Sequence, residues 1–212
     1  MRIAAIAVLT TAVLAVTGRP AWATTIFTLG NNPQPGEENI LLNDGTVGTT
    51  VFGTTNQSNA SVEFDSTQSL TEPILGQARI EATDGIGQIG LTNVTISVPN
   101  GSYGDLIFNP YLGAIGAGDG TLTVSVLDDF GSIATFSYSI GNGSNFLTIT
   151  TAGGQRIVST NMSYDLAGGF TDLRQIRISD VDAPAVPEPA SLTLLGLGLA
   201  GMGARRWRQR TP

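Results

Sequence analysis

The sequence predicts an all-β protein with one antiparallel β-sandwich domain, and three observations support this prediction. Apolar and polar residues alternate with period two in Val94–Val98, Leu122–Val126 and Phe136–Ile140, which is the pattern of strands with one buried and one wet face. Short runs of Asn, Asp and Gly separate such segments and favour tight turns. No window before Ala190 shows convincing helical periodicity.

The strands are expected to be many and short. Leu122–Val126 and Ile133–Ile140 are joined by about six residues and should form a hairpin. Regular spacing of such strands is typical of a jelly-roll-like or immunoglobulin-like sandwich. Residues 31–39, NNPQPGEEN, are expected to form a surface loop. The other expected strands are Ile26–Leu29, Val62–Phe64, Ala78–Ala82, Leu106–Phe108, Phe146–Thr150, Met162–Leu166 and Ile176–Ser179.

The first 23 residues have the three parts of a secretory signal peptide. Arg2 gives a positive start, residues 3–16 are uncharged and apolar, and Ala21-Trp22-Ala23 matches an A-x-A cleavage site. We therefore expect residues 1–23 to be removed during export and the mature chain to begin at Thr24.

The domain predicted for residues 24–180 is strongly acidic, and an acidic, proline-bearing linker is expected at 181–186. Four arginines, no lysine and seventeen acids fall between Thr24 and Glu188, which gives a formal charge of −13. A surface of this sign repels phosphate backbones, so nucleic acid is not an expected partner. It suits solubility outside the cell, or cation binding.

The chain contains no histidine and no cysteine. These absences remove Ser-His and Cys-His nucleophilic systems, the usual zinc sites and disulfide bonds. We expect a protein that is not an enzyme and has no resident cofactor, with calcium as the one weak candidate because loop carboxylates are its ligands. The residues to inspect for calcium are Asp119, Asp180 and Asp182.

Two binding or catalytic alternatives follow from the remaining side chains. Tyr103, Phe108 and Tyr111 lie near glycine-rich loops and could stack on sugars in a lectin-like module, although buried core positions are the more common fate of aromatic residues. A glycosidase or lyase would need two carboxylates across a cleft. Neighbours such as Asp128 and Asp129 on a strand point to opposite faces, so this reading is the least favoured.

The C-terminal region contains a second apolar run. Residues 190–204 carry no charge and would span about 22 Å as a helix, which is short of a bilayer core of about 30 Å. We expect a short transmembrane helix here. Its stop signal is the basic cluster that follows, Arg205, Arg206, Arg208 and Arg210. The glycine pattern at 196–201 matches a dinucleotide fingerprint but lacks the strand and the downstream acid that such a site needs.

Residues 187–210 resemble the PEP-CTERM sorting signal of Gram-negative bacteria: Pro187, Glu188 and Pro189 come first, then an apolar run, then Arg205-Arg206. The resemblance implies recognition of the Pro-Glu-Pro region by an exosortase, a membrane protease or transpeptidase, and an association with exopolysaccharide and biofilm. Two further segments, Gly141–Phe146 and Gly169–Ser179, are similar to segments of domains often attached to such tails.

The expected function follows from the signal peptide and the C-terminal sorting signal. The chain should be exported across the inner membrane, anchored by its C-terminus, and then placed at the cell surface or released after processing. Its expected partners are an exosortase, the inner membrane and exopolysaccharide. A structural matrix component is the first hypothesis, and a carbohydrate-binding module, with or without calcium, is the alternative.

Overall fold

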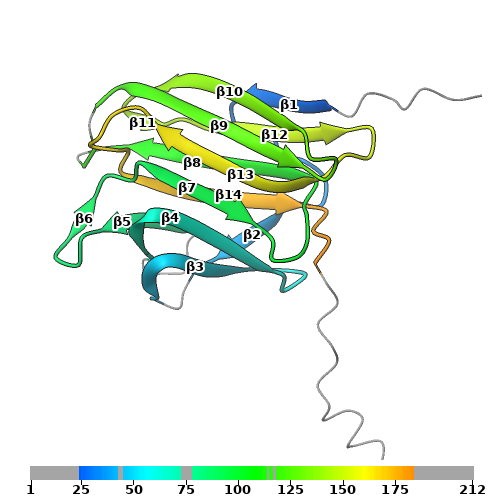
Figure 1. Cartoon of the computed structure of the whole chain (residues 1–212), viewed down its shortest axis with the longest axis horizontal. Helices are drawn as coiled ribbons and strands as arrows, with labels where there is room; N and C mark the ends of the chain where they lie inside the picture. Colours follow the sequence, from blue (N-terminus) through cyan, green and yellow to red (C-terminus); the bar gives the residue numbers. More distant parts are fainter. Residues whose placement is uncertain (1–23, 43–44, 73–77, 114, 117, 184–212) are drawn as a thin grey trace, which may run out of the picture.

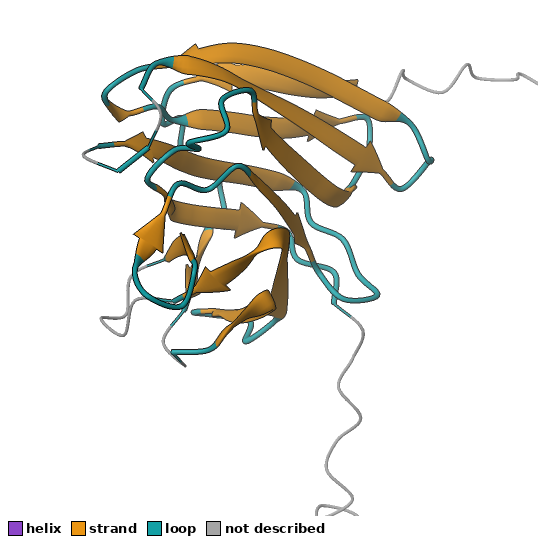
Figure 2. Ribbon diagram, turned by 60° about the vertical axis from the view of Figure 1, so that its left-hand side comes forward, coloured by secondary structure: helices purple, strands orange, loops and turns teal. Residues whose placement is uncertain are grey.

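The computed structural model describes residues 24–42, 45–72, 78–113, 115–116 and 118–183. Within these ranges the chain forms fourteen strands and no helix (Figure 2). The all-β class predicted from the alternation is therefore confirmed. The first described strand is β1.

The strands form two layers that lie one over the other along much of the molecule (Figure 1). All pairings are antiparallel. One layer has the order β1 (Thr24–Leu29), β12 (Leu147–Ala152), β8 (Asp105–Leu112), β14 (Asp172–Ser179). The other has the order β10 (Ile133–Ile140), β9 (Gly120–Asp128), β13 (Ile157–Tyr164), β7 (Asn93–Ser97).

A closed ring of five strands joins the two layers on one side. β14 pairs with β2, β2 with β3, β3 with β4, β4 with β5, and β5 with β14 again. The prediction of a single sandwich is therefore corrected to two layers with a closed ring. Two short strands complete the fold, β6 pairing with β5 and β11 with β8. The bounds are β2 (Glu38–Leu41), β3 (Val47–Thr55), β4 (Ser61–Thr71), β5 (Arg79–Thr83), β6 (Gln88–Ile89) and β11 (Gly143–Ser144).

The ring closes because β4 turns a corner in its middle. Antiparallel neighbours alternate in direction, so an odd number of strands can close only if a strand bends. The first half of β4 pairs with β7 and the second half with β5. At the corner, the Ser66 hydroxyl donates to the carbonyl of Asn93 at 2.7 Å, and the Gln68 side chain donates to the carbonyl of Gly90 at 2.8 Å. These bonds replace ladder bonds that the bend removes.

One apolar core fills the space between the layers and inside the ring. Strands β7 and β9 alternate buried and partly exposed residues along their length, as their sequence pattern predicted. Tyr103 and Phe108 are completely buried, and the Tyr103 hydroxyl donates to Thr160 Oγ1 at 2.9 Å. Both aromatic residues therefore belong to the core, so neither can stack on a sugar at the surface.

The predicted hairpin is confirmed, with Leu127 paired to Ile133. Strands β2 and β3 were missed in the sequence. β2 has only four residues, and β3 contains Gly48 and Gly53, which weaken a strand pattern. At Gly53 the missing side chain is required, since a Cβ would lie 2.5 Å from Ile40 Cγ2 of β2.

The chain leaves the domain beyond the end of β14. The predicted linker at 181–186 starts with residues that still contact the domain: Asp182 forms a β-bridge with Ser102, and Val181 and Ala183 pack against the core. The expected C-terminal helix lies outside the described residues. Among the described residues, no helix is long and apolar enough to cross a membrane.

Candidate functional site

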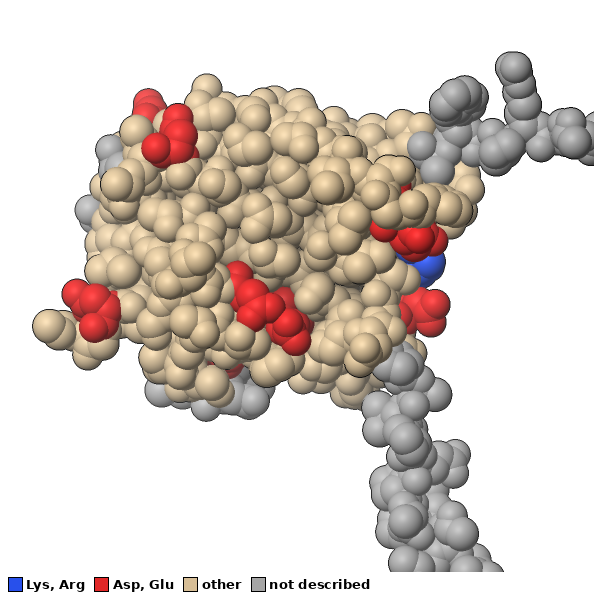
Figure 3. Space-filling view, in the orientation of Figure 1, with Lys and Arg blue, Asp and Glu red and all other residues tan. Residues whose placement is uncertain are grey.

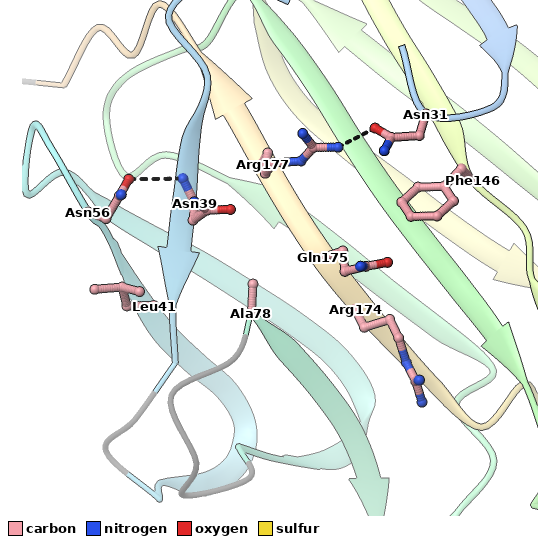
Figure 4. A pocket seen from close by; sticks show the side chains of 9 residues that line it. All are labelled: Asn31, Asn39, Leu41, Asn56, Ala78, Phe146, Arg174, Gln175 and Arg177. Carbon is pink, nitrogen blue, oxygen red and sulfur yellow. Dashed lines mark hydrogen bonds between the residues drawn. The ribbon is translucent and has the colours of Figure 1, made fainter. Parts of the chain in front are cut away.

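An open groove of about 560 Å³ lies on the outer face of β14 and β2 (Figure 4). Its size is within the usual range of ligand pockets. Polar side chains dominate it, with one aromatic ring. The lining residues are Asn31, Asn39, Leu41, Asn56, Ala78, Phe146, Arg174, Gln175 and Arg177.

The groove opens where β14 exchanges one neighbour for another. Arg174 is paired with β5, whereas Arg177 is paired with β2. Between them, two residues of β14 face one residue of β8, which is a β-bulge. The bulge residue Gln175 has a φ of 55°, a left-handed backbone that costs energy in residues other than glycine. Such strain is enriched at binding sites, and here it places an exposed amide at the groove.

A buried amide holds the bulge in place. Asn109 of β8 is 1% exposed, and its Nδ2 donates to Gln175 Oε1 at 2.9 Å. Its Oδ1 accepts the backbone N–H of Asn145 at 2.8 Å. Asn145 in turn closes its own loop, donating to the carbonyl of Gly141 at 2.7 Å. The position of Phe146, the next residue, is therefore tied to the position of Gln175 through Asn109.

At one end of the groove, Arg177 links three elements. Its Nη1 donates to Glu37 Oε2 at 2.7 Å, and its Nη2 donates to Asn31 Oδ1 (Figure 4). Glu37 also accepts a hydrogen bond from the backbone N–H of Gln34. The predicted surface loop at 31–39 is shorter than expected, because Glu38 and Asn39 already belong to β2. Its residues Asn31 and Glu37 are fixed to β14, and the charge of Arg177 is matched by a carboxylate.

At the other end, Arg174 is matched in the same way. Its guanidinium makes two hydrogen bonds to the carboxylate of Asp172, which is 0% exposed, and stacks on the Tyr111 ring at 3.6 Å. The bond to Asp172 is the main reason why the pKa of Arg174 is raised. Arg79 of β5 reaches the same carboxylate at 3.2 Å.

The neighbouring acid Glu81 completes this charge cluster. Arg79 Nη2 forms an ion pair with Glu81 Oε1. Burial raises the pKa of Glu81, and the positive charge of Arg79 only partly opposes this effect. Two arginines and two acids thus balance each other, and the cluster leaves no excess positive charge in the groove.

The lining of the groove is thus suited to an uncharged, hydroxyl-rich ligand. The side chains of Asn31, Asn39, Asn56 and Gln175 offer both donors and acceptors. Phe146 supplies a ring against which an apolar sugar face can lie. The described lining contains no carboxylate, so the groove gives no catalytic acid pair to the hypothesis of a glycosidase.

The structure separates the residues that the sequence suggested for calcium. Asp119 comes just before β9, whereas Asp180 and Asp182 follow β14. Both strands point toward the same side of Figure 1, so the start of β9 and the end of β14 lie at opposite ends. Within the described ranges, no group of three acids could hold a metal ion.

The remaining predicted sites fall in two groups. Of the suggested stacking residues, only Tyr111 is partly exposed, and the Arg174 guanidinium occupies its face. Asp128 instead fixes the hairpin loop, accepting the backbone N–H of Ser132 at 2.7 Å, and Asp129 links this loop to Arg156, accepting its backbone N–H at 3.0 Å. The cleavage site Ala21 and Ala23, the triplet Pro187, Glu188 and Pro189, and Arg205, Arg206, Arg208 and Arg210 lie outside the described residues.

The sequence did carry one signal for the groove. Phe146 ends one of the two segments that resemble tail-linked domains, and Arg174, Gln175 and Arg177 lie in the other. Their meeting through Asn109 could not be read from the sequence. The contributions of β2 and of the turn at Asn56 carried no such signal, because polar residues in loops are common.

Comparison with known proteins identifies the C-terminal segment. Residues 185–209 match the PEP-CTERM protein-sorting motif. This motif implies recognition by an exosortase, with export and membrane-associated processing in Gram-negative bacteria. No curated protein matches the chain. No solved structure matches it either.

Proposed function

We propose that this chain, addressed by its PEP-CTERM motif, is a non-enzymatic structural component of an exopolysaccharide or biofilm matrix. The observation that carries the proposal is the motif at residues 185–209. Its acidic β-domain is the part displayed after sorting. With a formal charge of −13 between Thr24 and Glu188, neighbouring copies repel each other and stay soluble outside the cell.

The arrangement of the domain is compatible with processing at a membrane. β1 starts and β14 ends on the same side of the molecule (Figure 1). The signal peptide and the sorting motif are attached to these two strands in the precursor. Both membrane-directed segments can therefore be handled while the domain projects away from the membrane.

The sorting proposal is tested by replacing Pro187, Glu188 and Pro189 with alanine in the producing cell. Mass spectrometry of the mature C-terminus and fractionation of cells and medium are the measurements. We expect loss of C-terminal processing and retention in the membrane fraction. The control replaces three exposed domain residues, Thr28, Ile86 and Asn142, with alanine. Processing and location that match the unaltered protein in the triplet variant would contradict the proposal.

A second candidate function is favoured by the groove. We propose that it binds a neutral glycan, with amides contacting hydroxyl groups and Phe146 contacting a sugar face. A β-fold by itself does not indicate lectin-like binding, so the proposal rests on the residues that line the groove. The matched charges of Arg174 and Arg177 favour a neutral ligand over an acidic one.

Titration calorimetry with the cell's own exopolysaccharide tests this candidate. It is run with calcium and with a chelator, beside an acidic polysaccharide. We expect saturable binding of neutral chains and a roughly three- to tenfold loss of affinity in Phe146→Ala, by the usual worth of a stacking contact. Phe52→Ala is the matched control, because Phe52 is 47% exposed and outside the groove. Absence of saturable binding under both conditions would end this proposal.

A further inference from the structure

Within the part of the chain that the structure describes, the strand β10 is a sheet edge without the usual protections. Among the described strands it pairs only with β9. Its sequence, Ile133–Ile140, contains no charge and no proline, and its register against β9 is continuous. Soluble proteins normally block such edges with lysine, proline or a bulge, because unpaired backbone groups are a template for another strand.

Apolar side chains are also incompletely covered on this side. Phe27 of β1 stacks on Phe136 of β10 with ring centroids 5.2 Å apart, which closes the gap between the two layers. Leu29 points to the same side of β1 as Phe27 but remains 58% exposed. Ile133, at the start of β10, is 70% exposed on the outer face that it shares with Thr135 and Ser137. Apolar side chains near this edge therefore remain exposed both on β1 and on the outer face of β10.

A second copy of the chain fits this edge by its own symmetry. In an antiparallel pair, directly opposite residues point to the same face. A two-fold axis at Ser137 places Phe136 opposite Tyr138 of the second copy on the inner face, and Thr135 opposite Ser139 of the second copy on the outer face. Aromatic residues then meet aromatic residues, and hydroxyls meet hydroxyls, which are favourable cross-strand pairs.

The charge distribution favours the same contact. Two copies carry a large charge of the same sign, so they can approach only where few acids lie. Neither β10 nor β1 contains an acid. Over the face formed by β10, β9 and β13, few charged atoms are visible (Figure 3). Hydroxyl pairs such as Thr123 and Ser137, 2.9 Å apart, cover part of it.

We propose that two copies of this protein pair their β10 strands antiparallel about Ser137, so that two eight-residue strands form one continuous sheet across the dimer. The contact is isologous and closes as a two-fold dimer. It goes beyond the sorting and glycan proposals and depends on neither. A matrix component paired in this way presents two groove faces at once.

Cysteine trapping tests the register directly, because the chain has no cysteine of its own. The mature exported protein is purified, oxidised under mild conditions and run on a non-reducing gel. Opposite residues of an antiparallel pair have Cα atoms about 4.5–5.5 Å apart, within the range of a disulfide bond. We expect Ser137→Cys to form a disulfide-linked dimer. Asn161→Cys, exposed on β13 in the same layer, is the control and stays monomeric.

Charge exchange gives an independent test in solution. Ser137→Lys places two like charges opposite each other, so the variant should be monomeric by sedimentation at concentrations where the unaltered protein is dimeric. Ser137→Glu should behave in the same way, and a mixture of the two variants should dimerise again. Circular dichroism verifies that both variants fold. A monomeric unaltered protein, or Ser137→Cys that crosslinks no faster than Asn161→Cys, would overturn the proposal.

Discussion

Ser102 and Asp182 exchange both of their backbone hydrogen bonds, with N–O distances of 2.9 and 2.8 Å. This bridge fixes the last described turn of the chain before the sorting motif. Arg156 reinforces it, since its Nε donates to Ser102 Oγ at 2.7 Å and its Nη2 donates to the carbonyl of Asp180. The adjoining Gly101 leaves no room for a side chain, as a Cβ would lie 2.2 Å from the Asp182 carbonyl oxygen.

The first prediction concerns this exit segment. Arg156→Ala removes hydrogen bonds from a charged donor and should destabilise the bridge locally by about 1–2 kcal/mol. Amide hydrogen exchange at Asp182 should become roughly tenfold faster while exchange in β9 is unchanged. Arg177→Ala, at the groove, is the control and should leave Asp182 unaffected. Equal protection of Asp182 with and without Arg156 would show that the clamp contributes nothing.

The second prediction concerns Glu38, which fixes the turn between β3 and β4. Its Oε2 accepts hydrogen bonds from the backbone N–H groups of Gln57 and Ser58, at 3.0 and 2.7 Å. Burial by itself raises the pKa of Glu38, but these hydrogen bonds outweigh it and the pKa is lowered. The stabilisation is therefore complete above pH 4.5, the ordinary value for glutamate, and is lost as pH falls through the lowered pKa.

Glu38→Gln should accordingly cost about 1–2 kcal/mol at pH 7, by the worth of a charge-assisted hydrogen bond. The difference from the unaltered protein should shrink toward pH 3. Urea unfolding at several pH values provides the measurement. Asp119→Asn makes the same change of net charge at an exposed site and serves as the control. A cost that is independent of pH would contradict the assignment.

The third prediction concerns Glu63, whose effect on stability changes with pH in the opposite direction to that of Glu38. Glu63 and Asp65 lie two residues apart on β4, and a hydrogen bond to Asp65, together with burial, raises the pKa of Glu63. A raised pKa adds stability below the ordinary glutamate value, and this stability is lost as pH rises through the raised pKa. Glu63→Gln should therefore raise the thermal midpoint at pH 7 and leave it unchanged at pH 4. The gain should be below about 1 kcal/mol, because the pair is partly solvated.

The measurement for Glu63 is a set of thermal scans between pH 4 and 7. Asp119→Asn again controls for net charge. If Glu63→Gln were destabilising at pH 7, the ionised carboxyl group of Glu63 would not be destabilised by its neighbour Asp65, and the prediction would be wrong.

The fourth prediction concerns the buried carboxylate behind the groove. Asp172 is 0% exposed and holds both Arg79 and Arg174, whose side chains are 33% and 29% exposed. Asp172→Asn should cost about 2 kcal/mol, less than for a fully buried pair because water reaches both arginines. A double-mutant cycle with Arg174→Gln, followed by urea unfolding, should give a coupling of at least about 1 kcal/mol. If the effects of the two substitutions on the free energy of unfolding simply add, Asp172 and Arg174 stabilise the fold independently and not as an ion pair.

Local patterns were sufficient for some elements and not for others. β7 and β9 have alternating sequences because one face of each is buried, and the inward residues of β10 are at least partly buried, so these strands and the hairpin were predictable. β2 and β3 have no such clear pattern. β2 is held by pairing with β14, which is distant in sequence, whereas β3 pairs with the next strand, β4, across a shift of register. In such strands, pairing with other strands outweighs the intrinsic β-propensity of the residues.

The candidate site illustrates the same limit. Gln175 looks like an ordinary polar residue in a strand, and only the bulge against β8 turns it into the groove. Asn109 is a polar residue that the fold buries because it satisfies Gln175 and Asn145 together. Tyr103 and Phe108, which looked eligible for sugar stacking, lie in the core instead.

By itself, the sequence determined the all-β class and the sorting motif at residues 185–209, because both depend on residues close together in the chain. It also predicted the export signal and the acidic character of the β-domain. Only the tertiary structure decided that five strands close a ring, that a groove forms at the bulge of β14, and that β10 remains an uncovered edge. These features depend on which distant strands become neighbours, and antiparallel pairing leaves no trace of its partner in the local alternation of residues.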